Sequence, residues 1–157
     1  MLFNIPSLRL AATVLAFASL SACSKKKDDA PAPTNPEGMS WTVDGGNVTA
    51  ATAVSQTSGS DITLAGGTGT TGASSGIFLE VPKTAGTYTL SSTSNSSASY
   101  QVTPASGSTQ SYEATTGTIV VSGITATNIT GTYTFTGTDV NGTTSKTISN
   151  GKFNVKL

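Results

Sequence analysis

Two glutamates, Glu80 and Glu113, are the side chains of this sequence whose type could support acid–base chemistry as a pair. Glycoside hydrolysis uses two carboxylates that face one cleft, about 5 Å apart in retaining enzymes and about 6.5–9.5 Å apart in inverting ones. Each glutamate, however, lies in an alternating run on the side opposite its apolar neighbours, which is the ordinary position of a solvated charge. We therefore expect no catalytic residue, and a glycoside-active enzyme using these two glutamates is the minor hypothesis.

Other catalytic and metal chemistries are excluded by residues that the sequence lacks. It contains no histidine and one cysteine, Cys23. A Ser-His-Asp triad, a Cys-His pair and a His-dependent zinc site are impossible without histidine, and one cysteine cannot form a disulfide or a thiolate cage within the chain. We expect no metal site and no cofactor.

The charge pattern argues against nucleic acid as a partner. The 157 residues include only 10% charged residues, and the formal net charge is zero. The single basic run, Lys25 to Lys27, is followed directly by Asp28 and Asp29. Binding to a phosphate backbone depends on clustered Lys and Arg side chains, which this sequence does not have.

The N-terminal segment has the features of a secretory signal peptide. Arg9 provides a positive charge, and an apolar run follows from Leu10 to Leu20, too short for a stable membrane span. The run ends in Leu20, Ser21, Ala22 and Cys23, a tetrapeptide that resembles the bacterial lipobox. This resemblance implies that residues 1–22 are a helical signal peptide that is removed, and that the Cys23 thiol carries a diacylglyceryl group. Two or three acyl chains hold a protein durably on a membrane, whereas one holds it only marginally.

Residues 23–38 are expected to form a disordered tether behind the lipidated cysteine. They show no apolar periodicity and contain Pro31, Pro33 and Pro36. Proline favours an extended chain that rises about 3.1 Å per residue. The lysines and aspartates after Cys23 also resemble the leader of Bacteroidota surface lipoproteins, and simple solubility of a linker explains them equally well.

Residues 39–157 are predicted to form an all-β domain. In "GIFLEVP", Ile77, Leu79 and Val81 share one face and Phe78 and Glu80 the other. The same alternation occurs in "NITGTYTFTGTD", and it predicts a final strand with Phe153, Val155 and Leu157 on the inner face. We therefore predict an antiparallel β-sandwich or flattened β-barrel of about eight to ten strands.

Turn residues separate these runs at short intervals. Asn141-Gly142 is the strongest signal, since Asn-Gly tolerates positive φ at both central positions of a type I′ turn. It predicts a hairpin between strands near residues 129–138 and 143–149. A further turn is expected at Asn150-Gly151, and another in the run Asp44 to Gly46.

The domain resembles a group of small uncharacterised Bacteroidota lipoproteins. The resemblance rests on the motifs "MSWTVDG", "GTYTLSS", "GTIVVSGI", "GTYTF" and "ISNGKF", which together cover nearly all of residues 39–157. Those proteins look all-β, and the resemblance brings no assigned activity. It implies an all-β fold and an outer-membrane location, facing either the periplasm or the cell surface.

The expected function is therefore non-enzymatic, and two versions remain open. In the first, the domain is a binding or accessory module, and Trp41 or Tyr100 stacks on a glycan or an envelope protein. Trp41 alternatively anchors the core, since Val43 has the same parity in the first strand. In the second version the protein is a structural or interaction protein of the envelope with a Thr-rich outer face. In both, the chain contacts the membrane through its N-terminal lipid.

Overall fold

Alternating side chains place one face of each strand in the core. In the computed structural model, which describes residues 35–69 and 72–157, Ile77, Leu79 and Val81 are buried while Phe78 and Glu80 are exposed. Ile129, Tyr133 and Phe135 are buried in the same alternating way. The predicted alternation is confirmed for both runs. Residues 1–34, which contain the predicted signal peptide and most of the predicted tether, lie outside the described residues.

Ten strands make up the described part of the chain. They are β1 (Gly38–Val43), β2 (Gly46–Thr49), β3 (Thr52–Ser58), β4 (Asp61–Gly67), β5 (Ser74–Pro82), β6 (Gly86–Leu90), β7 (Ser97–Thr103), β8 (Gln110–Ile124), β9 (Asn128–Asp139) and β10 (Ser145–Lys156).

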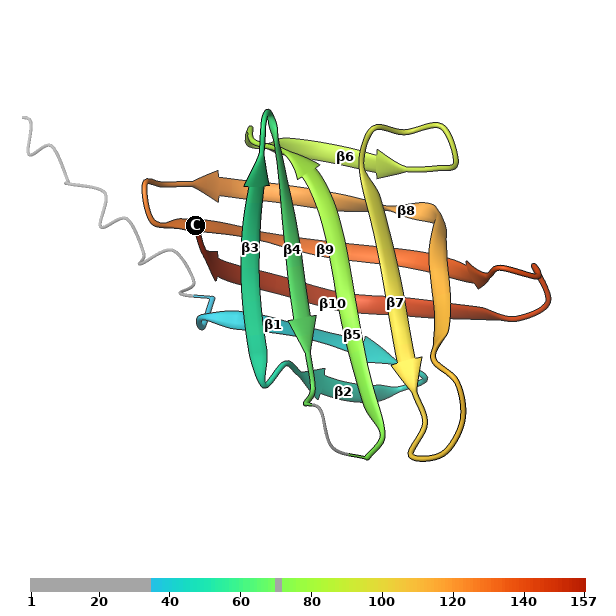
Figure 1. Cartoon of the computed structure of the whole chain (residues 1–157). Helices are drawn as coiled ribbons and strands as arrows, with labels where there is room; N and C mark the ends of the chain where they lie inside the picture. Colours follow the sequence, from blue (N-terminus) through green and yellow to red (C-terminus); the bar gives the residue numbers. More distant parts are fainter. Residues whose placement is uncertain (1–34, 70–71) are drawn as a thin grey trace, which may run out of the picture. The chain divides into compact units, whose positions relative to one another are not determined.

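Nine of these strands form one curled antiparallel sheet in the order β2-β1-β10-β9-β8-β7-β5-β4-β3, and β6 pairs with β8 outside this path. Figure 1 shows that β3, β4, β5 and β7 cross in front of β1, β2, β9 and β10 at a steep angle. The strands thus form two layers, a front layer that ends at β3 and a back layer that ends at β2. The prediction of an all-β sandwich or flattened barrel is confirmed.

The long strand β8 belongs to both layers. Its first residues pair with β7, and residues 117–121 pair with β6, while β9 follows the other edge. A register shift between Ala114 and Thr116 precedes Gly117, whose φ is +145°. A bulge followed by a glycine bends a strand sharply, so this point forms the corner between the layers.

The core fills the space between the two layers. Trp41, Tyr133 and Phe153 are the largest of its fully buried side chains. The layers also approach each other at the edge away from β8, where the Ser55 hydroxyl in β3 donates a hydrogen bond to the Lys156 carbonyl in β10 at 2.6 Å. The two layers are therefore joined by β8 at one edge and by this hydrogen bond at the opposite edge.

The hairpin predicted between strands near residues 129–138 and 143–149 is confirmed, because β9 and β10 pair antiparallel, but the predicted type I′ turn between them was wrong. The β9–β10 connection is a five-residue loop, and Asn141 is not among the residues with positive φ, so no type I′ turn forms there. That geometry occurs at Asp44 and Gly45, whose φ values are +51° and +79° between β1 and β2.

Asn150-Gly151 is a bulge within β10 and not a turn. The register with β9 shifts between Ile148 and Gly151, and Asn150 has a φ of +52°. The strand continues because β9 and β1 pair with it on both sides of the bulge. Leu157 lies beyond the end of β10 and is 40% exposed, so its predicted inner position was also wrong.

Candidate functional site

The two aromatic residues proposed as stacking surfaces lie in the core. Trp41 in β1 is 2% exposed and Tyr100 in β7 is 6% exposed. Burial raises the pKa of Tyr100, whose ring lies 6.1 Å from that of Tyr112. Neither ring presents a face to solvent, so the prediction that they stack on a ligand is corrected. Their inward parity, shared with apolar neighbours, decides this outcome.

The two candidate catalytic glutamates share a sheet face without forming a cleft. Glu80 pairs across β5 and β7 with Ser97, and Glu113 pairs across β8 and β7 with Ser99. They are thus two strands and two residues apart, which places their Cα atoms about 12 Å from each other on a regular sheet. Both are exposed, and each accepts a hydrogen bond from a serine, Ser97 or Ser111. This arrangement does not support a glycosidase pair.

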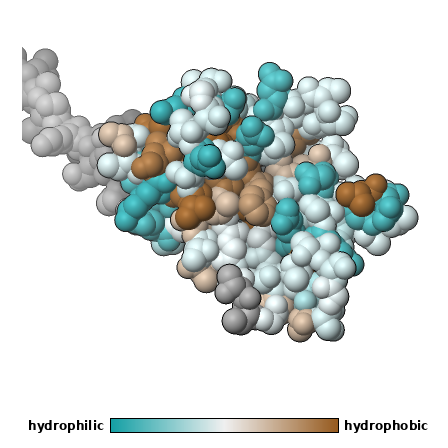
Figure 2. All heavy atoms as spheres, viewed as in Figure 1, coloured by the Kyte–Doolittle hydropathy of each residue, from teal (hydrophilic) through white to brown (hydrophobic). Residues whose placement is uncertain are grey.

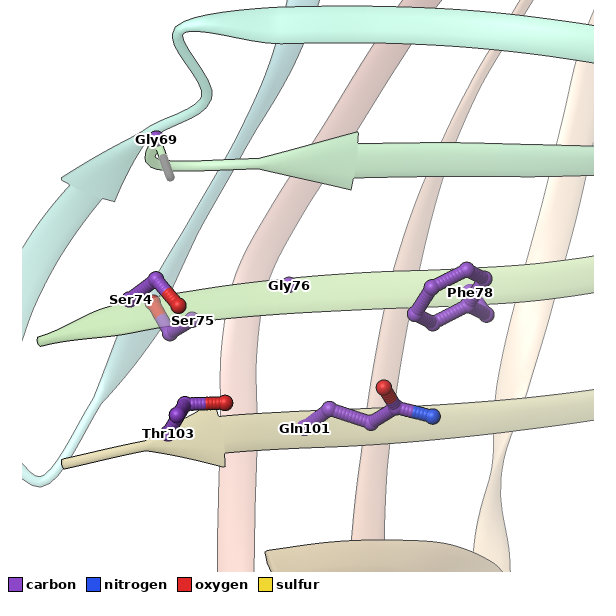
Figure 3. Close-up of a pocket in the computed structure, with 7 residues that line it drawn as sticks. All are labelled: Gly69, Ser74, Ser75, Gly76, Phe78, Gln101 and Thr103. Carbon is purple, nitrogen blue, oxygen red and sulfur yellow. The ribbon is translucent and has the colours of Figure 1, made fainter. Parts of the chain in front are cut away.

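The same outer face of the front layer carries a shallow depression that we call the Phe78 trough. It has a volume of about 170 Å³ and runs along β5 between β4 and β7 (Figure 3). Its lining residues are Gly69, Ser74, Ser75, Gly76, Phe78, Gln101 and Thr103. The trough therefore lies on a sheet surface whose strands β4, β5 and β7 are each paired on both sides.

Glycine forms the floor of the trough. Gly76 in β5 pairs with Gly67 in β4, so two neighbouring positions lack side chains. A Cβ atom at Gly76 would lie 3.2 Å from the Gly66 carbonyl oxygen and 3.8 Å from Cε2 of Phe78. The Phe78 ring therefore lies beside the position that a side chain at Gly76 would occupy, and a flat ligand can approach the bare backbone there closely.

Apolar surface extends from the trough across the front layer. Ala65 in β4 pairs with Phe78 on one side and with Val54 in β3 on the other. Phe78 is 39% exposed and Val54 is 61% exposed. Figure 2, which views this layer from outside, shows hydrophobic surface in the middle of the face with polar residues around it. Ala65 and Val54 do not line the trough, so this row lies beside the candidate site and is not part of it.

The polar groups of the trough carry no charge. Gln101 lies on β7 beside Phe78, with its carboxamide extended toward the ring (Figure 3). The Thr103 hydroxyl is hydrogen bonded to Thr109 at 2.8 Å, whereas no other described residue bonds to the Gln101 carboxamide. An uncharged amide with two donors and one acceptor is thus available to a ligand.

Sequence reasoning missed Phe78 and Gln101 as site residues, although part of the signal was visible. In β5, Phe78 lies on the same face as Glu80 and opposite the apolar residues Ile77, Leu79 and Val81. The alternation of side chains along the strand therefore already predicts a large apolar ring on the solvent-facing side. Nothing in the sequence indicates that Gln101 lies beside it. That position depends on the pairing of β5 with β7, which are not consecutive strands, and in this pairing Gln101 lies opposite Gly76, two residues before Phe78.

Two further observations concern metals and membranes. In residues 35–69 and 72–157, no three His, Cys, Asp or Glu side chains gather where they could hold a metal ion. In the same ranges, no helix long and apolar enough to cross a membrane is present. Cys23 and the lipobox residues Leu20, Ser21 and Ala22 lie outside the described residues.

Comparison with known proteins gives one family. No curated protein and no solved structure matches the chain. The domain of unknown function DUF6252 matches residues 43–155, from the end of β1 to the last residues of β10. Because the match spans most of the chain and nearly every strand of the domain, the chain belongs to the DUF6252 family.

Proposed function

We propose that this protein is a lipid-anchored protein of the outer membrane whose β-domain is a non-enzymatic binding module. The anchoring proposal is supported by Leu20, Ser21, Ala22 and Cys23 directly after an apolar run. The binding proposal is supported by one observation above all. Phe78, 39% exposed, borders a glycine-floored trough, and the Gln101 carboxamide on the neighbouring strand has no hydrogen-bond partner in residues 35–69 and 72–157. The anchor holds this surface at the envelope.

The alternative is a purely structural or interaction role in the envelope. It is supported by the outer face of the back layer, where five threonines of β9 alternate with inward residues: Thr130, Thr132, Thr134, Thr136 and Thr138. In register with them lie Thr118 of β8 and Thr147 of β10. A surface of paired β-branched residues stabilises strands and needs no ligand.

Lipid attachment is tested by mass spectrometry of the native protein. We expect a mature chain that begins at Cys23 and carries acyl chains. Cys23→Ala should leave the protein in the soluble fraction, because the acceptor thiol is gone, while Pro31→Ala in the tether should remain with membranes. An unmodified Cys23 thiol on membrane-bound protein would refute the anchor.

Binding is separated from a structural role by a binding panel. The lipidated protein, incorporated into phosphatidylethanolamine vesicles, is sedimented with neutral polysaccharides, acidic polysaccharides, denatured collagen and DNA. Saturable binding to any one class supports a binding module. Absence of binding to all four classes supports the structural alternative.

Catalysis is tested on the same polysaccharides by product release. The proposal predicts no turnover by the wild-type protein or by its Glu80→Gln and Glu113→Gln variants. Turnover that either substitution abolishes at unchanged stability would instead establish an enzyme.

A further inference from the structure

We propose that the Phe78 trough is a binding site for a neutral glycan, with a sugar ring stacked on Phe78 and its hydroxyl groups hydrogen bonded to Gln101. This inference rests on the proposed binding function and names its ligand class. It is carried by four features of the described residues: the ring, the bare floor, the free carboxamide and the absence of charge in the lining.

The ring and floor fit a flat ligand with an apolar face. One face of a pyranose exposes mainly C–H groups, which pack on an aromatic ring as other apolar groups do. Phe78 offers its ring at the end of the trough, and Gly76 leaves the backbone beside it uncovered. A side chain at Gly76 would meet the ring within 3.8 Å and fill the space that the sugar needs.

The polar groups fit the rim of hydroxyls around such a ligand. The Gln101 carboxamide donates two hydrogen bonds and accepts at its oxygen, so it can bond to adjacent hydroxyls in either sense. The Ser74 and Thr103 hydroxyls lie further along the same trough (Figure 3). A few such polar groups beside an apolar surface are sufficient to fix the orientation of a bound small molecule.

The absence of charge selects a neutral ligand. None of the seven lining residues is ionisable. A sulfate, phosphate or uronate group needs a cation or a cluster of N–H donors, and burying it without one costs free energy. The charged residues nearest in the register, Glu80 and Glu113, are both acidic and would repel an anion.

An extended peptide is disfavoured by the backbone of the site. Peptides commonly bind sheets by adding a strand at an open edge. The trough lies on a face, and β4, β5 and β7 have partners on both edges. The backbone donors and acceptors under the trough are therefore already used, and recognition falls to the side chains.

The test is a titration of the full-length lipidated protein, in detergent, with neutral gluco- and manno-oligosaccharides and with an acidic oligogalacturonate. We expect saturable binding of at least one neutral ligand and none of the acidic one. Phe78→Ala should weaken binding at least about tenfold. Gln101→Ala should weaken it about three- to tenfold, as expected for a lost hydrogen bond.

Val54→Ala is the matched control, because Val54 is exposed in the same cross-strand row but does not line the trough. It should change the affinity less than twofold. The fluorescence of Trp41, the only tryptophan, reports whether each variant is folded.

The outcomes separate this inference from the proposed function. Neutral binding that survives Phe78→Ala would place the ligand elsewhere and overturn the site while leaving the binding function intact. Binding of the acidic oligosaccharide or of denatured collagen in place of neutral sugars would overturn the ligand class alone. Self-association through this face, abolished by Phe78→Ala, would identify a second copy as the occupant and overturn the inference. Absence of binding to every probe would overturn both proposals.

Discussion

At the scale of single residues, two glycines permit aromatic rings to lie on the backbone of a neighbouring strand. Gly131 in β9 pairs with Phe153 in β10, and Gly151 in β10 pairs with Tyr133 in β9. A Cβ atom at Gly131 would lie 2.3 Å from Cζ of Phe153, and one at Gly151 would lie 2.5 Å from Cδ2 of Tyr133. These reciprocal pairs allow the two rings to stack with centroids 6.3 Å apart. The glycines are therefore required by packing and not by a turn.

Gly131→Ala is accordingly expected to destabilise the fold by about 2–4 kcal/mol. The added methyl group would overlap the Phe153 ring and the Val120 carbonyl oxygen, and the carbonyl belongs to the backbone of β8 and cannot rotate away as a side chain can. Urea unfolding measures the change. Gly46→Ala is the control, because its Cβ atom meets only the Val43 carbonyl at 3.5 Å and should cost less than about 0.5 kcal/mol. Equal effects of the two substitutions would contradict this account.

At the scale of elements, the β9–β10 loop is organised by one carboxylate. Asp139 Oδ1 accepts hydrogen bonds from the backbone N–H groups of Thr143 at 2.7 Å and Thr144 at 3.1 Å, and Oδ2 accepts one from the Thr143 hydroxyl at 2.9 Å. These bonds, led by that from the Thr144 backbone, hold the pKa of Asp139 below its usual range. One carboxylate at the end of β9 thus binds the residues just before β10, across an exposed loop.

The loop should therefore open in acid. Because the pKa of Asp139 is lower in the folded state, its contribution is complete above the unfolded-state pKa of about 3.9 and is lost as the pH falls through the folded-state value. We expect the amide resonances of Thr143 and Thr144 to titrate together with a midpoint below 3.9.

Asp139→Ala should abolish this titration, whereas Asp61→Ala, outside the loop, should preserve it. A midpoint at or above the value of a free aspartate would show that the hydrogen bonds do not stabilise the charged form.

A second element, the long strand β8, connects three other strands because it pairs with β6, β7 and β9. The segments "GTYT" at residues 86–89 and 131–134 pair with its opposite edges, so that Tyr88 and Tyr133 both face Ile119. The two similar segments therefore occupy equivalent positions on either side of one strand. The bend at Gly117 then carries β8 into the front layer, where it pairs with β7.

At the scale of the whole molecule, distant segments close the structure. β1 pairs with β10, and two hydrogen bonds join Asn35 to the end of β10: Asn35 Nδ2 donates to the Phe153 carbonyl, and Asn154 Nδ2 donates to the Asn35 carbonyl. The first described residue is therefore hydrogen bonded to the last strand, β10. Because both layers share β8 and one core, neither layer can bury its apolar face alone.

The domain should consequently unfold in a single transition. Far-UV circular dichroism reports all strands, whereas the fluorescence of Trp41 reports the core beside β1. We expect the two urea curves to coincide, as for a two-state domain. Separate midpoints would show that the front and back layers unfold independently.

The order of residue types alone predicts which face of each strand is buried, and it excludes every chemistry that needs histidine. Period-two alternation is local, so the inward positions of Ile77 and Tyr133 and the outward position of Phe78 follow from the neighbouring residues alone. The absence of histidine is likewise a property of the residue types alone. The leader with Cys23 is a prediction of the same local kind.

Which strands are neighbours, in contrast, depends on how the whole chain packs. Alternation selects a face but not a partner, so the pairing of β5 with β7, which sets Gln101 beside Phe78, could not be derived from the sequence. For the same reason the turn predicted at Asn150-Gly151 was wrong, since the pairing of β1 and β9 with β10 makes it a bulge. The candidate site arises from pairing between distant segments, and that pairing depends on how the whole core packs.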